Sequence, residues 1–173
     1  MTRKVLFLGL SALVFSLVAC DDSTSASDSQ RKGSFPQHGY PNFICEVTDG
    51  TNEDGSTWAQ ILVNIPHYMG EVEKLTTDER GNGSQYIEEA YFGNSEREKR
   101  NMCLEYDEFV REEKEKGEKN ITDHFCGDGV FYFVTEFSGA RIDRLASRMQ
   151  SFRERCEDYQ KKWDEGEYEE FQK

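Results

Sequence analysis

The clearest hydrophobic pattern in the chain lies near its C-terminus and is helical. Apolar residues recur there at alternating spacings of three and four, at Ile142, Leu145, Met149, Phe152, Cys156, Tyr159 and Trp163. This spacing places all of them on one helix face, with Arg and Glu residues opposite. The face also suits a coiled-coil seam. We expect it to pack on a sheet instead, because Cys156 within it indicates a covalent partner in the same fold.

A second helix is indicated by its start and stop signals. Ser95 followed by Glu98 fits a capping box, in which a hydroxyl and a carboxylate satisfy the free amides of the first turn. The helix is expected to run to about Lys116, where Gly117 supplies the left-handed residue that ends many helices.

Shorter apolar patterns predict strands between and around these helices. They cover residues 43–48, 57–65, 68–76, 85–92 and 130–137. The turn cluster at 49–56 and the Asn82-Gly83 pair predict two hairpins. The run from Val130 is apolar on both faces, as in a central strand. The sequence therefore predicts an α+β fold, with an antiparallel sheet of four to five strands packed against two helices.

The N-terminus has the pattern of an export signal. Arg3 and Lys4 precede an apolar run of about 14 residues, which is shorter than the ~20 of a membrane-spanning helix. The run ends in Leu17-Val18-Ala19-Cys20. This resembles the lipobox of bacterial lipoproteins. The resemblance implies that residues 1–19 are a signal peptide, and that Cys20 becomes the new N-terminus and carries a diacylglyceryl group and often an amide-linked acyl chain such as palmitate.

The same resemblance implies a location, and the composition of the rest of the chain indicates a domain plan. We expect a protein anchored to a membrane of the cell envelope through Cys20, on the exported side, with the choice of inner or outer membrane left open. Residues 20–34 then form the lipidated cysteine and a flexible tether. Residues 35–163 form a single domain, and residues 164–173 form an acidic flexible tail.

Four further cysteines, Cys45, Cys103, Cys126 and Cys156, indicate two disulfides in an exported chain. Three pairings are open. If the strand at 130–137 runs between two roughly parallel helices, Cys156 comes near Cys126 and Cys103 stays at the opposite end. We therefore expect Cys45 to pair with Cys103, and Cys126 with Cys156.

Charge and composition narrow the classes of partner. The chain has 34 acidic and 21 basic residues, a formal net charge of −13. Such a charge argues against binding nucleic acid or anionic lipid surfaces. No nucleotide-binding, hydrolase or zinc motif is present, and His38, His67 and His124 do not lie at metal-ligand spacings. We expect no cofactor, no metal ion and no catalytic residue.

These observations favour a non-enzymatic envelope lipoprotein that binds a protein or a glycan. The alternative is a polysaccharide hydrolase with two carboxylates about 5–10 Å apart. Aromatic residues are concentrated in the β region, at Tyr40, Phe43, Trp58, Tyr68, Tyr86, Tyr91 and Phe92. They either fill the core, which we favour because the domain is poor in Leu, Ile and Val, or present rings to a ligand.

Overall fold

The computed structural model describes residues 33–36, 38–117, 120–139 and 143–172. The signal peptide, Cys20 and nearly all of the tether lie outside these residues and stay predictions. In chain order the elements are β1 (Ile44–Thr51), β2 (Thr57–Ile65), β3 (Met69–Thr77), β4 (Gly83–Tyr91), α1 (Glu96–Lys116), β5 (Asn120–Gly127), β6 (Val130–Phe137), α2 (Asp143–Asp164) and a short 3₁₀ helix (Glu169–Gln172). The α+β fold with two helices is confirmed. Within this part of the chain, no helix is long and apolar enough to cross a membrane.

The sheet has six antiparallel strands in the order β1-β2-β3-β4-β6-β5, not the four to five expected. The additional strand is β5. Its sequence, NITDHFCG, is polar at most positions, and Ile121 is its only buried residue. An edge strand that is solvated on one side does not need the continuous apolar pattern of a central strand, so its sequence looked like a loop.

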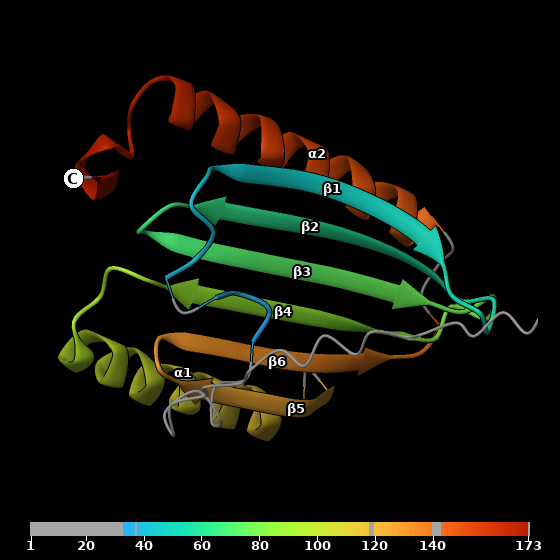
Figure 1. Ribbon diagram of the computed structural model, residues 1–173. Coiled ribbons are helices and arrows are strands. Elements are labelled where there is room, and N and C mark those ends of the chain that lie inside the picture. The colour runs from blue at the N-terminus through green and yellow to red at the C-terminus, as the bar shows by residue number, and fades with distance from the viewer. Residues whose placement is uncertain (1–32, 37, 118–119, 140–142, 173) are drawn as a thin grey trace, which may run out of the picture. The chain divides into compact units, whose positions relative to one another are not determined.

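Both helices lie on the same face of the sheet. Directly opposed residues on neighbouring antiparallel strands point to the same side. One such row crosses the whole sheet through Val47, Ile61, Glu73, Ile87, Phe133 and His124. α2 packs on Ile61 and α1 packs on Phe133. Figure 1 accordingly shows α2 running alongside β1, and α1 beside β5 and β6.

The apolar stripe predicted for the last helix is the surface that packs on the sheet. Phe152 is fully buried at its centre, against a cluster that includes Ile61, Val63 and Ile65 of β2. Six of the seven stripe residues, from Leu145 to Trp163, belong to this core, and Ile142 lies outside the described residues. Packing on the sheet, rather than a coiled-coil seam, therefore accounts for the spacing.

The segment that precedes β1 packs on the opposite face of the sheet. Phe35 lies against Val72, Ala90 and Val130. The carboxylate of Glu88, fully buried in the sheet, accepts hydrogen bonds from the Ser34 amide at 2.7 and 2.9 Å. Because a buried carboxylate needs such donors, these bonds hold the start of the domain in place.

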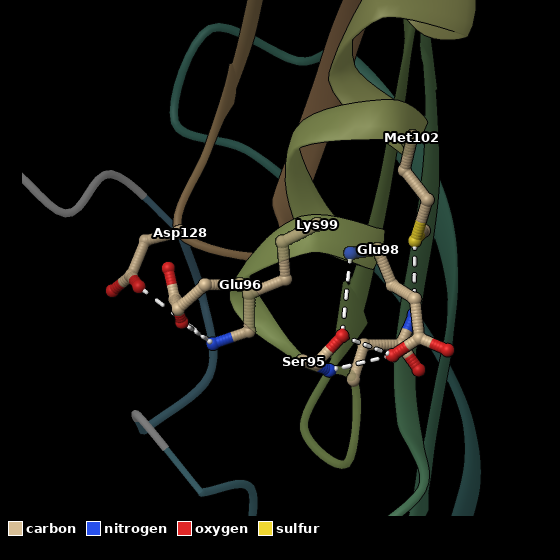
Figure 2. Close-up of polar contacts among 7 residues, drawn as sticks. Ser95, Glu96, Glu98, Lys99, Met102 and Asp128 are labelled. Atoms are coloured by element: carbon tan, nitrogen blue, oxygen red, sulfur yellow. Dashed lines mark hydrogen bonds and ion pairs between the residues drawn. The ribbon is translucent and has the colours of Figure 1, made fainter.

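α1 begins with the predicted capping box (Figure 2). The Ser95 hydroxyl accepts from the Glu98 amide at 3.4 Å, and the Glu98 carboxylate accepts from the Ser95 amide at 2.7 Å. The Ser95 hydroxyl also donates to the Glu98 carboxylate at 2.7 Å, and this bond, together with the one from the Ser95 amide, holds the pKa of Glu98 below its usual range. Lys99 lies between the carboxylates of Glu96, at 3.0 Å, and Asp128, at 3.9 Å. Gly117 ends the helix in the left-handed conformation, as predicted.

Replacing the N-cap residue should measurably destabilise the domain. Ser95→Ala removes the acceptor for the Glu98 amide, so we expect the free energy of unfolding to fall by about 1 kcal/mol. Urea unfolding followed by far-UV circular dichroism checks this. Ser138→Ala, at an exposed loop serine, is the control and should leave stability within about 0.5 kcal/mol of the parent protein. An equal effect of the two substitutions contradicts the capping assignment.

The disulfides differ from the expected pairing. Cys45 is bonded to Cys156, and Cys103 to Cys126, with Cα–Cα distances of 5.6 and 5.4 Å. The expectation of Cys45–Cys103 and Cys126–Cys156 was wrong because it placed β6 between the two helices and α1 near β1. In the structure β1 and β5 lie at opposite edges, and each disulfide links an edge strand to the helix that covers it.

The acidic C-terminal segment, expected as a flexible tail, carries two aromatic contacts. The rings of Tyr168 and Phe171 stack on Tyr68, with centroids 5.9 and 4.1 Å away. Tyr168 also packs against the core beneath α2.

Candidate functional site

The outer edge of β1 offers unpaired backbone groups. The Asn52 amide donates to the Ser56 carbonyl at 2.8 Å, one position beyond the last β1–β2 pair, so these two residues form a bonded pair. Bonded and non-bonded pairs alternate in an antiparallel ladder. The N–H and C=O groups that point away from β2 are therefore those of Cys45, Val47, Asp49 and Thr51. Among the described residues, none forms a hydrogen bond with these groups.

A groove lies beside this edge, between β1 and α2. It has a volume of about 700 Å³. Val47 and Cys156, which is bonded to Cys45, form the apolar part of its lining. Its wall is a stripe along α2 and its end, made of Arg153, Glu157, Gln160, Lys161, Asp164 and Glu165. An extended chain placed beside β1 would meet backbone groups along its edge and this groove on one side.

The disulfide fixes the distance between the strand and the helix that form the groove. It joins the second residue of β1 to the middle of α2. Nearer the end of α2, the ring of Phe43 stacks on Trp163 with centroids 4.9 Å apart. A change in the distance between α2 and β1 would therefore require breaking the disulfide or the ring contact.

The opposite edge is built differently. A groove of about 540 Å³ also lies between α1 and β5, beside His124. Here, however, the β5–β6 register shifts between Ile121 and Asp123. Such bulges disrupt an edge and are a common protection against pairing with another chain. β1 pairs with β2 without a shift over its full length and contains neither Pro nor Lys. β1 is therefore the edge suited to adding a strand.

This geometry predicts an alternating pattern of amide hydrogen exchange in the free protein. The amides of Glu46, Thr48 and Gly50 donate to β2 and should exchange slowly. Those of Val47, Asp49 and Thr51 face outward and should exchange at least about tenfold faster. Exchange followed by NMR on the oxidised protein measures this. Uniform protection along β1 would show that its outer edge is already covered.

A cluster of charges beneath α2 was not anticipated from the sequence. Glu71 and Glu73 of β3 are buried on the helix face. Arg155 forms ion pairs with both carboxylates, and Arg148 lies 2.8 Å from Glu73. The Tyr159 hydroxyl donates to Glu71 at 3.0 Å. Burial raises the pKa of Glu73, and Arg148 acts against that shift. These contacts bind α2 to the sheet, because each carboxylate is held by cations and hydrogen-bond donors.

The aromatic residues of the β region mostly belong to the packed clusters. Phe43, Tyr68 and Tyr91 contact the core under α2, and Tyr40, Tyr86 and Phe92 contact Phe35 or its neighbours on the other face. Trp58 instead carries the Lys74 ammonium over its ring, 4.6 Å from the centroid. Core packing thus accounts for most of this set.

The remaining candidate residues are the histidines and the cysteines. Among the described residues, no group of three or more His, Cys, Asp or Glu side chains could hold a metal ion. Cys45, Cys103, Cys126 and Cys156 are all in disulfides, and Cys20 lies outside the described residues.

Comparison with known proteins adds no relative. No family model matches the chain, and neither the curated proteins nor the solved structures include a significant match.

Proposed function

We propose that the protein is a lipid-anchored, non-enzymatic binding module of the bacterial envelope, and that it binds an extended segment of a partner protein along β1. The observation that carries the proposal is the row of outward-facing backbone groups at Cys45, Val47, Asp49 and Thr51 beside the groove under α2. Proteins that bind peptides by strand addition gain affinity from main-chain hydrogen bonds, and specificity from pockets for alternate side chains.

The geometry of the groove specifies the pattern of the bound segment. Alternate side chains of an added strand point to the same face. Those on the helix side would lie on Val47 and the disulfide, so apolar residues suit these positions. Those on the other side would lie next to Glu46 and Thr48, which face away from the helices. We expect an alternating segment with apolar residues on one side and polar residues on the other.

Charge indicates that the segment is basic. The groove wall contains the acids Glu157, Asp164 and Glu165 against two bases. Exposed acids of the β1–β2 hairpin add to them at Glu46, Asp49, Glu53 and Asp54. With a net charge of −13 on the whole chain, a cationic segment is attracted over long range, and a second copy of this chain is repelled.

The hydrolase alternative gains no comparable support. Glu71 and Glu73, both buried on the helix face, are held by Arg155, and Arg148 also pairs with Glu73. A carboxylate pair in hydrolysis needs free oxygens facing a sugar, one to protonate the leaving group and one to attack or activate water. The contacts of these two residues are those of a structural ion cluster.

Selection from a displayed library of random 12-residue peptides tests the proposal. The oxidised protein is the target, and calorimetry then measures the affinity of synthetic peptides. We expect selected sequences to alternate apolar and polar residues and to carry net positive charge. For each, a matched peptide with its basic residues replaced by acidic ones should bind at least about tenfold more weakly. Failure to recover any saturable binder, or selection of acidic sequences, would contradict the proposal.

A further inference from the structure

A second hollow lies on the helix face, away from β1. It consists of two adjoining cavities of about 390 and 350 Å³ that share Gln85, Arg144 and Arg148 as lining residues. Arg144 and Arg148 come from the first two turns of α2, and Gln85 from β4. The cavities therefore lie where the N-terminal part of α2 passes over the middle of the sheet.

The two arginines differ in their partners. The Arg148 guanidinium is 2.8 Å from the buried carboxylate of Glu73, so part of its charge is already compensated. The Arg144 guanidinium lies over the ring of Phe137, 4.8 Å from the centroid. Among the described residues no carboxylate forms an ion pair with Arg144. A guanidinium stacked on a ring keeps its in-plane N–H donors available, and it presents them as a planar fork.

The rest of the hollow is lined by apolar and by polar side chains. Apolar side chains form one part, including Ile87, Phe133 and Leu75. Ser147 and Ser151 of α2 contribute hydroxyls. Gln85 is held in place because its amide donates to Glu73 at 2.6 Å. Glu136 adds one negative charge, so the charged lining residues sum to +1, in a chain whose net charge is −13.

We propose that this hollow binds a small organic carboxylate, with its carboxylate on Arg144 and its apolar body against Phe133 and Ile87. A planar fork matches a carboxylate in a bidentate arrangement. The lining is mainly polar, with a smaller apolar part formed by Leu75, Ile87, Phe133 and Phe137. At this volume, such a lining suits a small ligand that has a charged end and an apolar body. The site is separate from the β1 edge and does not depend on the function proposed for it.

Titration of the oxidised protein with benzoate, followed by NMR, tests this proposal. Benzoate carries a planar carboxylate on an apolar ring, and benzyl alcohol serves as its neutral counterpart. We expect saturable shifts at the amides of Gln85, Arg144 and Ser147, with a Kd on the order of 1 mM. Benzyl alcohol should bind at least about tenfold more weakly. Equal affinity for the two probes, or no saturable shift at these amides, overturns the proposal.

Two variants and one further anion complete the test. Arg144→Gln should weaken benzoate binding about tenfold or more. It should leave the fold intact, because Arg144 forms no ion pair with the described residues and lies over the Phe137 ring near the surface. Arg100→Gln, at an exposed arginine of α1 outside the hollow, should bind like the parent. Unchanged binding by Arg144→Gln contradicts the assignment of Arg144 as the residue that binds the carboxylate.

Competition with inorganic sulfate tests the class of ligand. If sulfate competes as tightly as benzoate, the hollow is a general anion site, and the proposal of an organic carboxylate is wrong.

Discussion

Removal of the Cys45–Cys156 disulfide, by the double substitution Cys45→Ala and Cys156→Ala, should lower the free energy of unfolding by about 5 kcal/mol. The bond closes a loop with a sequence separation of 111 residues. In the chain-entropy account, a cross-link stabilises by restricting the unfolded chain, and the gain grows with the logarithm of loop length. Because domains are stable by only about 5–15 kcal/mol, this loss is large enough to leave part of the protein unfolded at ordinary temperature.

The second disulfide provides a matched control. Cys103 and Cys126 are separated by only 23 residues, so the same account gives about 3 kcal/mol for Cys103→Ala with Cys126→Ala. Urea unfolding monitored by tryptophan fluorescence compares the two double variants with the oxidised parent. If the Cys103–Cys126 variant is the less stable of the two, loop length does not govern these bonds and the prediction is wrong.

The Cys45–Cys156 bond also has a consequence for binding. It joins the edge strand to the helix that forms the wall of the groove. Without it, the spacing between β1 and α2 depends on side-chain packing alone. The same disulfide therefore stabilises the fold and fixes the geometry of the proposed binding site.

Substitution of Val47 by proline should abolish most of the affinity for an extended peptide without unfolding the domain. The amide of Val47 points away from β2, so its loss leaves the β1–β2 ladder intact. Proline is tolerated on edge strands where its missing N–H faces solvent. The proline at position 47 would leave one carbonyl of the bound peptide without a donor, and its ring would keep the peptide backbone from approaching β1. We expect affinity to fall about tenfold to a hundredfold.

A conservative substitution at the same position separates backbone from side-chain effects. Val47→Thr keeps the N–H and the branched shape, so it should retain affinity within about fivefold. Calorimetry with one selected peptide and circular dichroism of each variant provide the comparison. A folded Val47→Pro protein that binds as tightly as the parent would show that the peptide does not pair with β1.

Local sequence signals predicted the helices well. The ends of α1 follow from the Ser95–Glu98 box and Gly117, and the face of α2 follows from the spacing of its apolar residues. Each of these features depends on residues within a few positions of one another. The β1–β2 and β3–β4 hairpins were predicted for the same reason, whereas the β2–β3 and β5–β6 hairpins were not.

Features that depend on strand order could not be predicted in this way. The polar sequence of β5 gives no local signal of a strand, and the strand forms by pairing with β6. The disulfide pairing depends on which edge strand is covered by which helix. Whether β1 is an edge or a central strand is also a property of the whole sheet. The candidate binding edge therefore had no sequence signal, and neither did the hollow at Arg144.

Hydrogen exchange of the β1 amides in the complex with a selected peptide tests the central claim most directly. In the free protein the amides of Val47, Asp49 and Thr51 face outward. If the peptide adds as a strand, these amides donate to it, and their exchange should slow by at least about tenfold on binding. The amides of Glu46, Thr48 and Gly50, already bonded to β2, should change little. A peptide that binds with measured affinity and leaves the outward amides unprotected would contradict binding at this edge.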